Sequence, residues 1–163
     1  MRFLLVDGLN VLHGSAQFSE YLPHNLFGAM EKLLHLLFSL LSSPDLQVVI
    51  VYDGGARGQF PEAETLHHRL SIIRTGAGKS ADETILKILS RIKNLRKDAR
   101  IFLASNDGGL RTAAAALGGE LLTVEELLER VRLHSAGMEE RLRRSEQQWT
   151  NRLGNHPGLN LDK

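Results

Sequence analysis

The chain has 163 residues, 42% of them hydrophobic, which is enough for one well-filled core but too few for two independently folded domains. Its 20 Lys and Arg residues nearly balance its 19 Asp and Glu residues, so a polyanion would have to bind a local basic patch. There is no cysteine, which excludes disulfides and thiolate metal sites and leaves oxygen and imidazole groups as metal ligands.

None of the apolar runs has the length of a signal sequence or a membrane span. The first run, residues 3–6, stops at Asp7, and the leucine-rich segment 33–41 contains His35 and is soon followed by Pro44. We therefore expect a soluble, cytoplasmic protein without a membrane partner.

Short apolar runs that stop at turn residues predict strands, and apolar residues at three- and four-residue intervals predict helices. The expected elements, in chain order, are a strand at residues 3–6, a helix at 25–41, strands at 48–52 and 70–73, a helix from about Ser80, a strand at 100–104, a helix at 110–117, a strand at 120–122 and a helix from Thr123. Ser80 and Glu83 have the spacing of a capping box. The alternation of strands and helices predicts an α/β fold, a three-layer α/β/α sandwich with a parallel central sheet.

The last part of the chain differs in composition from the rest. We expect a single folded domain over residues 1–133, followed at 134–163 by a charged C-terminal helix and a disordered tail from Gly154. The arginines near residue 143 are offset by glutamates, which favours a solvated helix over a dedicated RNA-binding arm.

Four aspartates occupy equivalent places in this pattern. Asp7, Asp53 and Asp107 each follow a predicted strand, and Asp82 opens a predicted helix. Because the carboxyl ends of parallel strands meet at one edge of a sheet, these acids should share a cleft. Crowded carboxylates repel one another unless a proton or a cation neutralises them, and Mg²⁺ or Mn²⁺ suits a site made only of oxygen ligands. Such a site suits phosphodiester hydrolysis.

A simpler interpretation exists for each acid. Aspartate is common where a strand turns into a helix, because it caps helices and tolerates turn geometry. Capping, however, does not require four acids to meet at one edge of the sheet.

The motifs around these acids resemble those of a known family. Residues 6–10, Val-Asp-Gly-Leu-Asn, resemble the Asp-Gly-x-Asn opening of NYN domains, a branch of the PIN-like nucleases, and in particular of the YacP-like group of small bacterial proteins. Asp53, the segment 79–83 and the segment 105–107 follow in the family's order, so the resemblance covers residues 1 to about 130.

The resemblance implies a metal-dependent endoribonuclease with a PIN-like (NYN) fold. It implies that Asp7, Asp82 and Asp107 are the principal ligands of Mg²⁺ or Mn²⁺, with Asp53 as a further ligand or acting through water. These four aspartates are the catalytic candidates. Many PIN domains have another acid where this chain has Gly109, which leaves the occupancy of a second metal position open.

Other side chains near these motifs are candidates for binding RNA. By the resemblance, Asn10 would orient Asp7 or contact substrate, and Ser105 would donate a hydrogen bond beside the metal ligands. Basic residues near the acids could bind phosphates or could be ordinary solvated charges. The substrate-binding candidates are Asn10, Arg57, Lys79, Ser80, Ser105, Asn106 and Arg111, with Arg74 as a further basic residue. Few aromatic residues stand near the acids in the sequence, so we expect weak sequence specificity.

Several alternatives are less consistent with the sequence. Gly78-Lys79-Ser80 lacks the earlier glycine of a phosphate-binding P-loop, and His67-His68 has no second ligand pair at zinc spacing. A magnesium-dependent phosphatase or phosphoacceptor domain would need paired acids that Asp7-Gly8 does not supply. The main alternative is a catalytically silent RNA- or ribosome-binding module of the same fold. RNA is the expected partner, and the ribosome or another part of the translation machinery is a further candidate that would present the RNA.

Overall fold

The computed structural model describes residues 1–54 and 62–154, with the side chains described as far as residue 148 except for that of residue 62. Its centre is a six-stranded sheet in the order β3-β4-β2-β1-β5-β6. The strands are β1 (Arg2–Asp7), β2 (Leu46–Tyr52), β3 (Glu62–His67), β4 (Leu70–Arg74), β5 (Arg100–Ala104) and β6 (Glu120–Leu122). The five strands predicted from the sequence are all present.

The central sheet is parallel, as predicted, except for one antiparallel pair at its edge. β3 pairs with β4 in the antiparallel direction, and β3 itself was not predicted. The reason is physical: an edge strand needs no continuous apolar run, and Glu64, Thr65 and Leu66 of β3 are exposed. The hydrophobic pattern that marks the central strands is therefore missing from β3.

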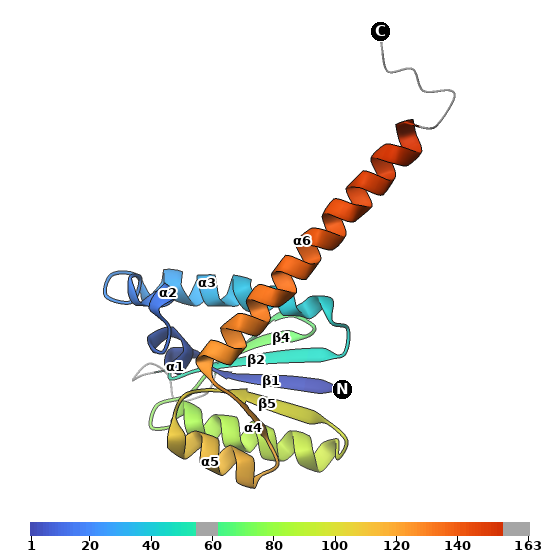
Figure 1. Cartoon of the computed structure of the whole chain (residues 1–163). Helices are drawn as coiled ribbons and strands as arrows, with labels where there is room; N and C mark the ends of the chain where they lie inside the picture. Colours follow the sequence, from blue (N-terminus) through green and yellow to red (C-terminus); the bar gives the residue numbers. More distant parts are fainter. Residues whose placement is uncertain (55–61, 155–163) are drawn as a thin grey trace.

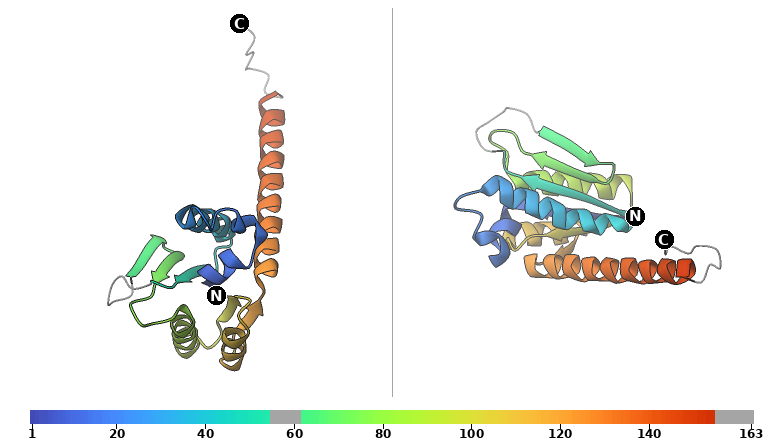
Figure 2. Two further views of the ribbon diagram at one scale, coloured as in Figure 1. Left: turned by 90° about the vertical axis from the view of Figure 1, so that its left-hand side faces the viewer. Right: turned by 90° about the horizontal axis from the view of Figure 1, so that it is seen from above.

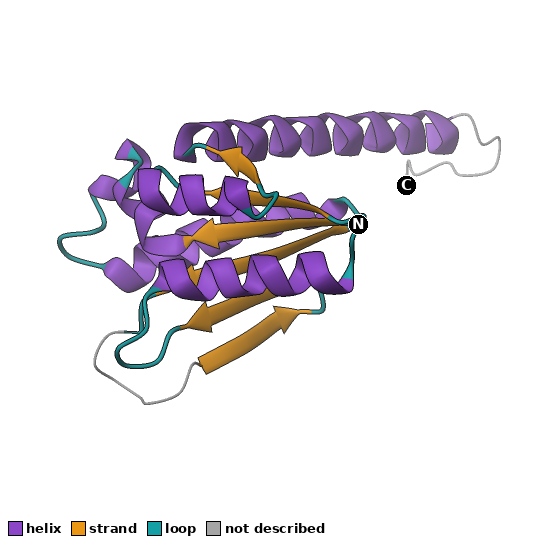
Figure 3. Cartoon of the chain, turned by 90° about the horizontal axis from the view of Figure 1, so that it is seen from below, coloured by secondary structure: helices purple, strands orange, loops and turns teal. Residues whose placement is uncertain are grey.

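Helices cover both faces of the sheet (Figures 1 and 3). They are α1 (Gly8–His13), α2 (Ala16–Ser19), α3 (Leu26–Phe38), a 3₁₀ turn (Ser39–Ser42), α4 (Ala81–Leu95), α5 (Gly108–Ala116) and α6 (Val124–Gly154). Alternate residues of β1 point into two separate cores: Leu4 and Val6 pack with α1, α3 and α6, whereas Phe3 and Leu5 pack with α4 and α5. This is the predicted three-layer α/β/α arrangement.

The helices differ from the prediction at α1, at α2 and at the end of α3. α1 and α2 were not predicted, because each is too short to show a helical period. The predicted helix at 25–41 ends at Phe38 and tightens into the 3₁₀ turn ahead of Pro44. The predicted cap of α4 is present, since the backbone N–H of Glu83 donates to Ser80 Oγ at 3.2 Å.

The last helix, α6, is continuous across the expected domain boundary at residues 133 and 134. Its first turns pack on the sheet through Leu127 and Val131, and the rest projects away from the sheet (Figures 1 and 2). Residues 155–163, most of the tail for which disorder was predicted, lie outside the described residues. No helix in the described ranges is long and apolar enough to cross a membrane.

The ends of β2 and β4 approach each other very closely at Gly54. Its backbone N–H donates to Thr75 Oγ1 at 3.0 Å, and the backbone N–H of Thr75 donates to the carbonyl of Tyr52 at 2.9 Å. A Cβ atom on Gly54 would lie 1.7 Å from the Thr75 carbonyl oxygen. Glycine is therefore required here by the lack of space.

We predict that Gly54→Ala destabilises the fold by about 1–3 kcal/mol, because the backbone of β2 or β4 must move to admit the methyl group. The measurement is the free energy of unfolding in urea. Gly108→Ala is the matched control: its added Cβ meets nothing within 4 Å, so we expect a change within about 0.5 kcal/mol. Equal effects of the two substitutions would contradict the role given to Gly54.

Candidate functional site

The four predicted aspartates lie at the carboxyl edge of the parallel strands. β1 pairs with β2 on one side and with β5 on the other, so successive strands are added to one side of β1 first and to its other side later. The strand order therefore reverses at β1. Ligands of open α/β sheets bind at such a point. Asp7 ends β1, Asp53 follows β2, Asp107 lies just beyond β5, and Asp82 is in the first turn of α4.

Asp7 is the most enclosed of the four acids, with only 7% of its surface exposed. Ser105 Oγ donates to Asp7 Oδ2 at 3.0 Å, and the backbone N–H of Asn10 donates to Asp7 Oδ1 at 3.4 Å. Burial raises the pKa of Asp7 to about 6, with a smaller contribution from the charges of Asp82 and Asp53, while the two hydrogen bonds oppose the rise.

Ser105 connects two of the acids. Its side chain is fully buried, and its Oγ both donates to Asp7 and accepts from the backbone N–H of Asp107 at 3.1 Å. Asp107 in turn caps α5, since its Oδ1 accepts from the backbone N–H of Leu110 at 2.7 Å. One hydroxyl therefore fixes the end of β1 relative to the start of α5.

Asp53 fixes the start of α4 relative to the end of β2. Its Oδ1 accepts from the backbone N–H of Ala81 at 2.7 Å and from Thr75 Oγ1 at 3.5 Å. This contact places the first turn of α4 at the end of β2 and brings Asp82 into the group. Burial raises the pKa of Asp82, and the neighbouring charges of Asp107 and Asp53 raise it further.

The capping interpretation is correct for individual acids but incomplete. Asp7 caps α1 and Asp107 caps α5, as that interpretation requires. In addition, the charges of Asp53 and Asp82 raise the pKa of Asp7, and those of Asp53 and Asp107 raise the pKa of Asp82, so the acids lie within electrostatic reach of one another. Only oxygen donors are present in this group, which fits a hard cation such as Mg²⁺ or Mn²⁺. Within residues 1–54 and 62–154, however, no three His, Asp or Glu side chains are already arranged around one point as metal ligands.

The predicted substrate-binding residues have different surroundings. Asn10 Oδ1 accepts from the backbone N–H of Asn106 at 2.7 Å, and Asn106 Oδ1 accepts from the backbone N–H of Val124 at 2.9 Å. Arg111 Nη1 donates to the carbonyls of Ser105 at 2.9 Å and Leu122 at 3.0 Å. All three side chains thus brace the loop that carries Ser105 and Asp107.

The remaining candidates are less constrained by such contacts. Ser80 caps α4, and Lys79 is exposed just before it. Arg74 ends β4, where its Nη1 lies 3.9 Å from Glu64 Oε2. Arg57 lies outside the described residues.

Sequence reasoning missed Thr75 and Tyr52. Thr75 is buried and contacts both Gly54 and Asp53. The signal was present: Thr75 directly follows a strand, as Ser105 does. Tyr52 is buried against Gly8, where a Cβ would lie 2.2 Å from the Tyr52 ring, and burial raises the pKa of its hydroxyl.

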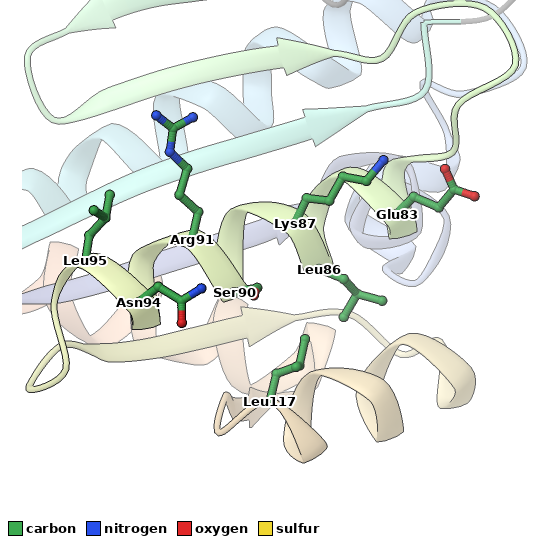
Figure 4. Close-up of a pocket in the computed structure, with 8 residues that line it drawn as sticks. All are labelled: Glu83, Leu86, Lys87, Ser90, Arg91, Asn94, Leu95 and Leu117. Atoms are coloured by element: carbon green, nitrogen blue, oxygen red, sulfur yellow. The ribbon is translucent and has the colours of Figure 1, made fainter.

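One surface pocket lies away from the acids. It follows the outer side of α4 and reaches Leu117 beyond the end of α5 (Figure 4). Its lining is mainly apolar, and the basic side chains of Lys87 and Arg91 extend from the same helix. None of the predicted site residues lines it, so the candidate site rests on the carboxylates and not on this pocket.

We predict that Asp7→Asn raises the stability of the metal-free protein by about 1–2 kcal/mol near pH 8, because an ionised carboxylate is no longer buried. The gain is full above pH 6, where folded Asp7 is ionised, and shrinks as the pH falls towards about 4, because the folded wild-type protein then takes up a proton. Thermal unfolding in EDTA at several pH values measures it. The exposed Asp98→Asn should show no such gain, and a destabilised Asp7→Asn at pH 8 would contradict the prediction.

Comparison with known proteins identifies the family. Residues 4–158 match the sequence model of the YacP-like NYN domain. The uncharacterized protein YacP of Bacillus subtilis (strain 168) is 27% identical over 140 residues, which cover 80% of this chain and 81% of YacP. The crystal structure of Rae1 (YacP) from Bacillus subtilis superposes with a TM-score of 0.75 at 25% identity, covering 94% of this chain and 87% of that chain. A mutant of Rae1 gives the same TM-score at 24% identity, covering 90% of this chain and 85% of that chain. Because the family match extends over nearly the whole chain, the protein belongs to the YacP-like NYN family, a branch of the PIN-like nuclease superfamily.

Proposed function

We propose that this protein is a metal-dependent endoribonuclease that hydrolyses phosphodiester bonds of single-stranded or flexible RNA in the cytoplasm. The observation that carries the proposal is the grouping of four aspartates at one sheet edge, where burial and neighbouring carboxylates raise the pKa values of Asp7 and Asp82. Family membership supports a nuclease-type function.

Asp7, Asp82 and Asp107 would hold Mg²⁺ or Mn²⁺, and Asp53 would contribute directly or through water. When bound, such an ion supplies polarisation of a phosphoryl oxygen and activation of water. The side chains would have to close around it, since no three of them are already arranged as ligands in the described residues. Asp82 is the side chain best placed to move, because Asp7, Asp53 and Asp107 are each held by a backbone N–H.

The other residues of the site hold these carboxylates in position. The Ser105 hydroxyl orients Asp7 and the backbone of Asp107, so that both acids face the same edge. Arg111 holds the carbonyl of Ser105, and Asn10 holds the backbone of Asn106. Cleavage by activated water would need no covalent intermediate and would leave a 5′-phosphate and a 3′-hydroxyl.

We predict that Asp7→Asn and Asp107→Asn each lower the rate of RNA cleavage by more than about 100-fold, because each removes a ligand charge. The measurement is cleavage of a labelled single-stranded RNA with Mg²⁺ or Mn²⁺, beside a DNA of the same sequence. Asp98→Asn, an exposed acid away from the strand ends, should cleave at the wild-type rate. RNA binding without cleavage by the wild-type protein would favour the silent RNA-binding module instead.

We predict that Ser105→Ala slows cleavage about 10- to 100-fold while RNA binding persists, because Asp7 and the Asp107 backbone lose their common partner. Metal titration of the cleavage rate should show a higher metal requirement. Thr112→Ala, which removes a hydroxyl that donates to the backbone carbonyl of Gly108 in its own helix, is the matched control. An unchanged metal requirement in Ser105→Ala would show that the hydroxyl does not position the ligands.

A further inference from the structure

A second surface pocket lies between α3 and the β3–β4 hairpin, on the opposite side of the sheet from α4. It encloses about 220 Å³. Met30, Leu34 and Ile72 supply apolar lining, and Phe27 and Arg74 also line it. Leu66 and two carboxylates, those of Glu31 and Glu64, complete the lining. An apolar pocket with a few charged groups is the usual form of a small-ligand or side-group site.

The pocket is linked to the acidic edge through Arg74. Arg74 is the last residue of β4, and Thr75 directly after it contacts Asp53. In the sheet, the Cα of Arg74 pairs with that of Tyr52, the residue before Asp53. The end of the pocket lined by Arg74 therefore lies beside the strand end that carries Asp53.

Phe27 is the most exposed phenylalanine or tyrosine side chain in the described residues. It is 66% exposed, although a phenyl ring is normally covered by the fold. A flat exposed ring is a platform on which a nucleobase can stack, and a nearby guanidinium can bind a phosphate. Arg74 remains available for that contact, because its ion pair with Glu64 is long, at 3.9 Å, and both side chains are partly exposed.

We propose that this pocket binds one base of the RNA substrate close to the bond that is cut, with the base stacked on Phe27 and a flanking phosphate on Arg74. The inference rests on the proposed endoribonuclease function. The two carboxylates, Glu31 and Glu64, can only accept hydrogen bonds, so the pocket favours bases with an exocyclic amino group, such as adenine and cytosine, over uracil. It would give the enzyme a base preference that the sequence alone did not suggest.

The test measures binding separately from cleavage. Fluorescence anisotropy with labelled oligoadenylate, oligocytidylate and oligouridylate is carried out in the Asp7→Asn background, where the bound RNA stays intact. We expect tighter binding of the first two, and a loss of about 5- to 100-fold in their affinity on Phe27→Ala. Phe27→Trp should keep the affinity, whereas Phe27→Leu should not, because stacking needs an aromatic ring.

Phe38→Ala is the matched control, since Phe38 is 51% exposed near the other end of the same helix, where its ring meets His67. Equal RNA affinity of Phe27→Ala and Phe38→Ala, or no measurable binding of any oligonucleotide, would overturn the proposal. So would a change of molar mass in solution on Phe27→Ala with RNA affinity unchanged, because the ring would then cover a second copy of the chain.

Cleavage by the wild-type protein is scored separately. If the wild-type protein cleaves RNA but its RNA affinity does not depend on Phe27, only the base-binding pocket is contradicted. If RNA affinity depends on Phe27 but the wild-type protein does not cleave, only the proposed nuclease function is contradicted.

Discussion

The hydrogen bond from the Ser105 hydroxyl to the Asp7 carboxylate is the contact on which the candidate site depends. It crosses from β5 to β1, the two strands between which the chain changes sides, and joins residues 98 positions apart. The same oxygen accepts the backbone N–H of Asp107. A fully buried hydroxyl with both roles satisfied holds two acids at one edge with little freedom, which is the pre-organisation that a metal-binding site requires.

The aspartates have a structural role that makes their crowding tolerable. Asp7, Asp53 and Asp107 each accept a backbone N–H at the start of a helix, so each carboxylate faces the positive end of a helix dipole. Burial still dominates at Asp7 and raises its pKa. Capping and metal binding are therefore compatible functions of the same side chains: the caps hold the acids in place, and a cation would offset the charge that remains.

The sheet order also decides what surrounds these acids. β3 pairs with β4 in the antiparallel direction at the edge of the sheet, and the resulting hairpin lines a pocket together with α3. This arrangement brings Phe27 and Arg74 together from distant parts of the chain. The acids and the pocket beside Phe27 thus result from the same topology. The acids lie at the carboxyl ends of the parallel strands, and the pocket lies at the antiparallel edge of the sheet.

The sequence by itself determined the five apolar strands, the main helices and the positions of the four aspartates, because buried strands, helical periods and the acids after strands are local patterns. It did not reveal β3, whose exposed residues carry no apolar run, or the role of Thr75, which depends on the approach of Gly54. It placed Arg111 and Asn10 among the candidate substrate contacts, but it did not reveal the backbone partners that the fold gives their side chains. Only the tertiary structure decided these points, because hydrogen bonds and pockets join residues that no local pattern connects.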